Sequence, residues 1–464
     1  PMTSLSSNGT GGNGPAPFSI HSVHFCHPHA RDAIVMRDPE DDALIGATPE
    51  WDRRGRDPAG RVRVAPAGRN APAAYPAGTQ PDIEVVFARV AGPEGDAAAG
   101  EWAVGATSAT DAPAVAEARV TLAFDAQGLS APVTLRLDRP LMGRIGVSSP
   151  RWTWHARRAD GVMAVGTSEH TIYTTWRRPL DAAPWARPVY GTYPNPSPDA
   201  GVANWTYAKL VAWTCEWAAG ADNPKAICDA IIANTHKSTL QYYVFAWDVR
   251  TMLLQGGGLC GGWYKMFQGM AAAHGVAVER RSYSVDWRTL DDQAALWCAI
   301  VVREPGLNRT APVEQASRFH DADHGADGTV REVTEPRYRF WGAPGSIHDG
   351  HCVNLLQHDG EWYVYDVSFF KHAVALRDFT LPPPDQQRRL GTSGLGNFRT
   401  AYLNEAVAYM LGSLRVRGTL YQSRHCSDPG SGPHHTPCVT ENGLTVRTAT
   451  VPDDGPGITF FWGP

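Results

Sequence analysis

The sequence has no long hydrophobic run. Hydrophobic residues make up 43% of its 464 residues, yet the longest uninterrupted stretches, such as Ala294–Val302, fall well short of the roughly 18 residues that a membrane-spanning helix needs. Residues 1–15 contain neither a basic segment nor an apolar one, so no secretory signal peptide is expected. We therefore expect no membrane span and a cytoplasmic protein by default, with export by a signal-less route as the alternative.

Cysteine is sparse, and the charges nearly cancel. The eight cysteines include no Cys-x-x-Cys pair, which argues against a disulfide scaffold and a zinc ribbon. The formal net charge of −5 gives no electrostatic footprint for binding nucleic acid or an anionic membrane. Seven of the cysteines are expected to be small buried hydrophobic residues, with a local bridge between Cys426 and Cys438 as the alternative.

Glycine and proline are abundant, at 46 and 36 residues, which favours turns and β-structure over a helical bundle. Short runs of period-two alternation, such as 82–90 and 151–157, recur between turn residues. This pattern predicts an all-β, immunoglobulin-like sandwich over 18–180. A Gly/Ser/Asn-rich tail, 1–17, precedes it and is expected to be disordered. A Pro-rich linker, 181–204, follows it.

From residue 205 the pattern changes, and we expect an α+β domain over 205–380. Its expected elements are helices at 204–220, 224–236 and within 256–274, and strands at 276–286, 296–302, 351–357 and 361–369. The charged, Gly/Pro-bearing segment 303–347 is expected to be an insertion or lid. The remaining residues, 381–464, are expected to form a small α/β appendage, with one helix over 398–411 followed by short strands.

A glycine-rich turn places Cys260 directly before an expected helix, in the sequence GGGLCGGW. The amides and the dipole at a helix N-terminus favour a thiolate and lower the pKa of such a thiol. The same amides can donate to a developing oxyanion, and the flanking glycines allow a substrate carbonyl to approach closely. Cys260 is therefore the candidate nucleophile, although a buried structural cysteine at a tight helix start would produce the same local pattern.

A predicted β-hairpin with a two-residue turn at Asp359-Gly360 supplies two further candidates, His351 and Asp366. The cross-strand pairs that this turn predicts are Gln357 with Trp362, Leu355 with Val364, and Val353 with Asp366. His351 then shares a face with Asp366 at a diagonal position, roughly 7–8 Å away at the backbone, within reach of a side-chain hydrogen bond. A loop of odd length would place the two on opposite faces. In the favourable register, Asp366 would orient the imidazole and support its charged form.

Taken in order, these residues resemble the transglutaminase-like superfamily of papain-type thiol enzymes, over about residues 205–375. The matching features are Gly258-x-Cys260, Phe267, His274-Gly275-Val276, His351 at the start of a strand, the Asp359-Gly360 turn, Trp362, and Asp366 in YDVSF. The resemblance implies a papain-like α+β core in which Cys260 is the nucleophile, His351 the general base and acid, and Asp366 the orienting carboxylate. It implies no organic cofactor.

The chemistry implied is acyl transfer at an amide bond of a peptide or protein through a Cys260 thioester. Water as acceptor gives a cysteine protease or a glutamine deamidase, and an amine as acceptor gives a transglutaminase. The side chain that completes the oxyanion site stays open, with Gln255, Trp247, Trp217 and Trp263 as candidates. The sequence specifies neither the substrate nor the oligomeric state.

Two other functions compete with this one. An arylamine N-acetyltransferase also uses Cys, His and Asp, but a preceding β-sandwich is not expected in that family. Alternatively, the chain is a non-catalytic binding or scaffold protein that uses its sandwich. A complete Cys/His/Asp set argues against the scaffold, because a degenerate enzyme usually loses one member.

Three weaker clusters have simpler interpretations. The segment 21–32 holds four histidines and Cys26, which suits a metal site or a strand leading into a loop. Residues 425–438 hold two cysteines and three histidines, which suit a metal or disulfide clip or a surface loop. Trp152 and Trp154 share a strand face and suit a ligand platform or the core. No D-x-D-x-D-G calcium loop is present. We expect 21–32 to be a strand leading into a loop, 425–438 to be a surface loop, and Trp152 and Trp154 to belong to the core. We expect no metal site.

Overall fold

The computed structural model describes residues 16–30, 32–53, 69–91, 97–159, 161–180, 205–242, 248–258, 260–286, 298–303, 338–341, 350–368, 370–381, 388–389, 396–403, 407–416, 419–421, 439–441, 444–450 and 459–463. The expected tail up to residue 15, the expected linker over 181–204 and most of the expected insertion over 303–347 lie outside these residues.

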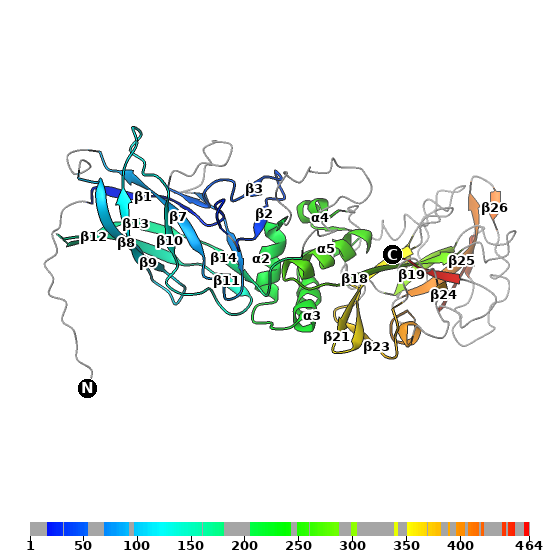
Figure 1. Ribbon diagram of the computed structural model, residues 1–464. Helices are drawn as coiled ribbons and strands as arrows, with labels where there is room; N and C mark the ends of the chain where they lie inside the picture. Colours follow the sequence, from blue (N-terminus) through cyan, green and yellow to red (C-terminus); the bar gives the residue numbers. More distant parts are fainter. Residues whose placement is uncertain are drawn as a thin grey trace. The chain divides into compact units, whose positions relative to one another are not determined.

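Contacts between residues divide the chain into two compact units. The first contains the strands up to residue 180 together with α2 (Ala208–Trp217). The second contains α3 (Pro224–Thr235), α4 (Val249–Gln255), nearly all of α5 (Cys260–Ala273) and the strands that follow. Figure 1 labels the strands and helices along the chain, and most of the strand pairs are antiparallel. The described residues therefore form a mixed α+β protein rich in strands, as the sequence predicted.

Four sheets make up the first unit. The two larger ones are antiparallel, with the strand orders β10 (Val133–Arg136), β7 (Asp82–Arg89), β1 (Phe18–His24), β4 (Trp51–Asp52), β5 (Arg69–Asn70), and β13 (Gly161–Glu169), β12 (Arg151–Arg158), β8 (Gly100–Ser108), β9 (Val115–Leu122). The two smaller sheets each contain one parallel pair, β14–β6 and β15–β2, and have the orders β11 (Gly146–Ser148), β14 (Ile172–Thr175), β6 (Ala73–Pro76), and β15 (Trp205–Tyr207), β2 (Val35–Arg37), β3 (Leu44–Ile45).

The two larger sheets share one hydrophobic core. β1 and β7 contribute Phe18 and Phe87, and β8 and β12 contribute Trp102, Trp152 and Trp154. The rings of Phe18 and Trp102 meet edge to face with centroids 5.0 Å apart. All five side chains are at most 3% exposed, because alternate residues of a strand point to the same face of its sheet. The prediction that Trp152 and Trp154 belong to the core is confirmed.

Residues 205–222 pack within the first unit, so the boundary expected at residue 205 lies too early. The thiol of Cys215 donates to the carbonyl oxygen of Thr174 in β14 at 3.4 Å. The amide of Gly220 donates to the carbonyl oxygen of Ile145 at 3.0 Å. A change from strand to helix periodicity marks a change of local structure, and α2 buries its apolar face against strands that precede it in the chain.

Two six-stranded sheets dominate the second unit. The first has the order β23 (Val374–Leu376), β22 (Glu361–Tyr365), β21 (Gly350–His358), β18 (Glu279–Asp286), β29 (Thr459–Gly463), β24 (Arg388–Arg389). The second has the order β20 (Tyr338–Trp341), β19 (Cys298–Arg303), β25 (Val407–Val416), β28 (Leu444–Thr450), β27 (Val439–Glu441), with β26 (Thr419–Tyr421) paired to β25. A short parallel pair, β16 (Gln241–Tyr242) with β17 (Gly257–Gly258), precedes α5.

The residues expected to form a C-terminal appendage complete both sheets. β29 pairs with β18, and β25 pairs with β19. The helix expected over 398–411 is wrong, because that stretch divides into a short π-helix, η3 (Phe398–Leu403), and the first residues of β25. A short apolar run such as VAYML fits a helix or a buried strand equally well, and here pairing with β19 decides for the strand.

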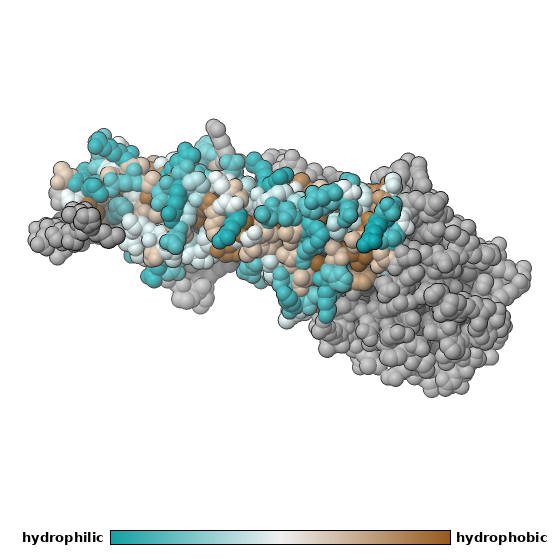
Figure 2. Space-filling view, turned by 90° about the horizontal axis from the view of Figure 1, so that it is seen from below, coloured by the Kyte–Doolittle hydropathy of each residue, from teal (hydrophilic) through white to brown (hydrophobic). Residues whose placement is uncertain are grey.

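The surface of the described residues is mixed in character. On the face shown in Figure 2, hydrophilic and hydrophobic residues alternate over the coloured area. Among the residues that the structure describes, the exposed large hydrophobic side chains are those of Val90, Val147, Val162, Leu180 and Leu254. Among the described helices, none combines the length and the apolar character needed to cross a bilayer.

Candidate active site

Cys260 is the first residue of α5 and follows a tightly held turn. α4 ends at Gly256, whose φ of 78° is the left-handed conformation that glycine adopts without strain. The next residues form β17, and the indole N–H of Trp263 donates back to the carbonyl oxygen of Gly258 at 2.8 Å. The expected glycine turn and helix start are both confirmed. Together they fix the thiol at the N-terminus of a helix.

The predicted hairpin also forms with the predicted register. Asp359 and Gly360 both have positive φ, 50° and 83°, as a two-residue type I′ turn requires. The pairs observed between β21 and β22 include Gln357 with Trp362 and Leu355 with Val364. β22 ends at Tyr365, so Asp366 is the first residue beyond it.

His351 and Asp366 meet as the register predicts. His351 Nε2 lies 2.8 Å from Asp366 Oδ2, and both side chains are almost completely buried. The other carboxylate oxygen, Oδ1, accepts the amide hydrogen of Ser368 at 3.0 Å. Because Asp366 engages Nε2, a proton exchanged with the neighbouring thiol of Cys260 would pass through Nδ1.

The charges around His351 favour the imidazolium. Burial opposes the charged ring, but the Asp366 carboxylate and the neighbouring Cys260 together raise the pKa of His351 from 6.5 to about 9. A buried carboxylate hydrogen-bonded to an imidazole stabilises its protonated form. The surroundings of His351 therefore favour the protonated ring at neutral pH.

The pKa of the Cys260 thiol shifts in the direction opposite to that of His351. A hydrogen bond from the Cys352 thiol lowers its pKa most, burial raises it, and the hydrogen bond and charge of His351 lower it further, to about 5. The thiol of Cys352 moves the opposite way, and its pKa lies well above the usual value. Both shifts favour a thiolate at Cys260 and an imidazolium at His351 at neutral pH. The sequence predicts a buried hydrophobic role for Cys352, whereas in the structure Cys352 is partly exposed and the folded hairpin brings it to Cys260.

α3 and α5 pack against the hairpin and hold it next to the helix start. Phe267 of α5 stacks on Tyr365 with ring centroids 5.1 Å apart. The hydroxyl of Tyr365 donates to Asp229 of α3 at 2.8 Å. α3 itself begins after Asn223, whose side chain accepts the amide hydrogen of Ala226 at 2.9 Å. These contacts lie outside the reacting groups and fix the elements that carry them.

One further residue that the sequence did not indicate joins this cluster. The hydroxyl of Tyr402, in η3, donates to Asp366 Oδ2 at 2.7 Å. Tyr402 lies in the stretch expected to be a separate appendage, and a tyrosine there carries no sequence signal. Only the fold of the C-terminal residues brings it to Asp366.

The oxyanion candidates are not brought together. Gln255 is the last residue of α4 and is exposed. Trp263 is buried with its N–H directed to Gly258, so it supports the turn. Trp217 belongs to α2 in the first unit, where its ring stacks on Trp213. Trp247 lies outside the described residues.

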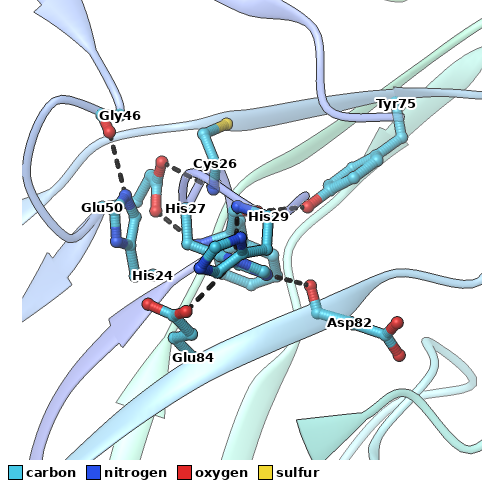
Figure 3. Close-up of polar contacts among 10 residues, drawn as sticks. His24, Cys26, His27, His29, Gly46, Glu50, Tyr75, Asp82 and Glu84 are labelled. Carbon is cyan, nitrogen blue, oxygen red and sulfur yellow. Dashed lines mark hydrogen bonds and ion pairs between the residues drawn. The ribbon is translucent and has the colours of Figure 1, made fainter. Parts of the chain in front are cut away.

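The histidine-rich segment 21–32 is tied to its surroundings in the first unit (Figure 3). The ring of His24 is hydrogen-bonded to the carbonyl oxygen of Gly46 at 2.9 Å. The ring of His27 bonds the carbonyl oxygen of Asp82 at 3.1 Å and lies 3.4 Å from the Glu84 carboxylate. The His24 bond joins the end of β1 to Gly46, and the His27 contacts join the loop after β1 to β7, which fits the expected strand leading into a loop.

The fully buried Glu50 and the partly buried Cys26 belong to the same cluster, and Cys26 is thus less buried than the sequence predicts. Glu50 accepts the amide hydrogens of Phe25 and Cys26 at 2.6 and 3.2 Å. Burial raises the pKa of the Glu50 carboxyl and, more strongly, that of the Cys26 thiol. Within the part of the chain that the structure describes, no three His, Cys, Asp or Glu side chains are arranged to hold a metal ion.

Two of the remaining cysteines behave as the sequence suggested. Cys215 and Cys228 are fully buried, and burial raises the pKa of both thiols far above the usual value. Cys426, Cys438 and the whole 425–438 segment lie outside the described residues, so the bridge and the clip stay predictions.

Neither the models of known protein families nor the curated proteins contain a match to this chain.

Proposed function

We propose that this chain is a thiol enzyme with a transglutaminase-like, papain-type core. It would catalyse acyl transfer or hydrolysis at amide bonds of a peptide or protein through a thioester on Cys260. One observation carries the proposal: His351 lies between Asp366 and Cys260 in a buried cluster whose charges favour a thiolate next to an imidazolium. Buried cysteines elsewhere in the chain have strongly raised pKa values instead.

The steps follow from this arrangement. The Cys260 thiolate attacks the amide carbonyl carbon, and the developing oxyanion accepts hydrogen bonds from backbone amides at the start of α5. The His351 imidazolium then gives its Nδ1 proton to the departing nitrogen as the C–N bond breaks, which leaves a thioester. Neutral His351 next takes a proton from water or an amine, which attacks the thioester. Collapse returns the thiolate and the imidazolium.

The test is mass spectrometry of glutamine-containing peptides incubated with the full chain, with and without a primary amine such as lysine. Backbone cleavage would identify a protease, conversion of glutamine to glutamate a deamidase, and an amine adduct a transglutaminase. Each product must disappear in Cys260→Ala and in His351→Ala. Cys228→Ala is the matched control, because it removes another buried thiol of the same unit, and it should retain activity.

Other results would overturn the proposal. Acyl transfer from an acyl-CoA to an arylamine, without any change in the peptides, would assign the N-acetyltransferase chemistry. The chain would instead be a non-catalytic binding or scaffold protein if no product formed and if iodoacetamide alkylated Cys260 no faster than an ordinary thiol.

A further inference from the structure

We infer that Tyr402 is a positioning residue of the proposed catalytic set, because its hydroxyl holds the Asp366 carboxylate in the orientation that His351 requires. The inference rests on the proposed function and adds a fourth residue to Cys260, His351 and Asp366. It also assigns a catalytic purpose to the C-terminal part of the chain, which contributes η3.

Both carboxylate oxygens of Asp366 accept hydrogen bonds. Oδ2 accepts two hydrogen bonds, from His351 Nε2 at 2.8 Å and from the Tyr402 hydroxyl at 2.7 Å. Oδ1 accepts the amide hydrogen of Ser368 at 3.0 Å. Donors on the two oxygens fix the plane of the carboxylate, so it cannot rotate about its Cβ–Cγ bond without breaking one of them. The O–H···O⁻ distance of 2.7 Å is in the range of charge-assisted hydrogen bonds.

Burial strengthens the effect of each of these hydrogen bonds on the Asp366 carboxylate. His351 and Tyr402 are fully buried, and Asp366 is 2% exposed. A charged group in such a place interacts strongly with its hydrogen-bond donors, and no bulk water replaces a donor that is lost. Without the Tyr402 hydroxyl, Oδ1 would keep the Ser368 bond and Oδ2 only the His351 bond, so the carboxylate would lose one of its three donors and be held less firmly.

The ring of Tyr402 is held independently of its hydroxyl. It contacts Phe398 and Phe370, with ring centroids 5.1 and 5.7 Å apart. The amide of Phe370 in turn donates to the carbonyl oxygen of Asp366 at 3.0 Å. Aromatic packing therefore fixes η3 against the turn that follows β22. The hydroxyl is an addition to that packing, and its position on Oδ2 is what points to the catalytic carboxylate.

The proton-transfer groups respond to this orientation. The titratable or charged groups acting on His351 and on its thiol partner are Asp366, Cys260 and Cys352, with Lys265 and Arg280 acting on Cys352. Of these, only Asp366 is hydrogen-bonded to Tyr402 through its side chain among the contacts described. When the carboxylate loosens, the imidazolium loses part of its stabilisation, and the thiolate loses part of its counter-ion.

The test is Tyr402→Phe in the full chain, which removes the hydroxyl and keeps the ring. The readout is the rate of Cys260 alkylation by iodoacetamide as a function of pH, which needs no natural substrate. The profile should show an acidic limb, where Cys260 ionises, and an alkaline limb, where His351 loses its proton. We expect the acidic limb to move to higher pH and the alkaline limb to lower pH. Each shift should be roughly half a pH unit, as one weakened hydrogen bond to a charged group implies. Peptide turnover should fall roughly tenfold in kcat with little change in KM.

Tyr363→Phe is the matched control, because the Tyr363 hydroxyl also donates to a carboxylate, that of Glu361 at 2.9 Å, in the same hairpin, and this bond is exposed and does not reach Asp366. It should leave both limbs in place. A Tyr402→Phe profile that coincides with the wild-type profile would assign Tyr402 to packing and overturn the inference. A Tyr402→Phe chain that does not fold would overturn it too, since the hydroxyl would then serve folding. Failure of the proposed function has a different signature, an unreactive Cys260 in the wild-type chain.

Discussion

Replacement of Asp366 by asparagine is the sharpest perturbation of the proposed site. The change keeps the shape of the side chain and removes its charge. The imidazole of His351 is fully buried, and burial by itself disfavours the imidazolium. Without the carboxylate, the pKa of His351 should therefore fall from about 9 to 6.5 or lower. That difference corresponds to roughly 3 kcal/mol of lost preference for the charged ring.

The consequence for Cys260 follows directly. A neutral imidazole no longer stabilises the thiolate, so the pKa of Cys260 should rise from about 5 toward its usual value of 9.0. Cys352 still donates its hydrogen bond, so the rise is partial. At pH 7 we expect alkylation of Cys260 to slow by roughly ten- to a hundredfold, in proportion to the thiolate that is lost.

The same substitution changes how stability depends on pH. The pKa of His351 is raised in the folded chain, so its stabilising contribution is complete below 6.5 and is lost as the pH rises through about 9. In the Asp366→Asn chain, this decrease in the free energy of unfolding at alkaline pH should be absent. Urea unfolding at a series of pH values measures it. Asp229→Asn is the control, because it removes a carboxylate hydrogen-bonded to Tyr365 in the same unit. An Asp366→Asn chain with wild-type alkylation rates and wild-type limbs would refute the reasoning.

Three other substitutions test neighbouring parts of the account. Cys352→Ala should raise the pKa of Cys260, because it removes the largest influence that lowers it; an unchanged acidic limb of alkylation would contradict this. Trp263→Phe should lower the free energy of unfolding by roughly 1–3 kcal/mol, through the lost bond to Gly258 and a smaller ring, and should slow alkylation; chemical denaturation measures the first effect, and full stability would argue against a held turn. Asn223→Ala should destabilise the chain by about 1 kcal/mol through the lost helix cap and leave alkylation unchanged; a loss of thiol reactivity would show coupling that the structure does not indicate.

The parts of the site that are local in sequence could be predicted. The Asp359-Gly360 dipeptide specifies a type I′ turn, and the turn fixes the register that brings His351 to Asp366. The glycines before Cys260 likewise predict a turn and a helix start, which the structure contains. In both places the conformational preferences of a few adjacent residues decide the result.

The parts that depend on distant pairing could not be predicted. Tyr402 and Cys352 join the cluster only through tertiary structure, and neither has a distinguishing sequence pattern. The C-terminal residues were expected to be an appendage because their strand pairing with β18 and β19 leaves no local trace. The helix α2 was assigned to the wrong unit for the same reason: its partner, β14, lies more than 30 residues earlier in the chain.

The ionisation of Cys260 in the wild-type chain tests the central claim most directly. The ultraviolet absorbance of its thiolate can be followed across the pH range as the difference between the wild type and Cys260→Ser. We predict that the thiolate forms with a midpoint near pH 5 and persists through neutrality. A midpoint at the usual thiol value of 9.0 would contradict the thiolate–imidazolium pair on which the proposed enzyme depends.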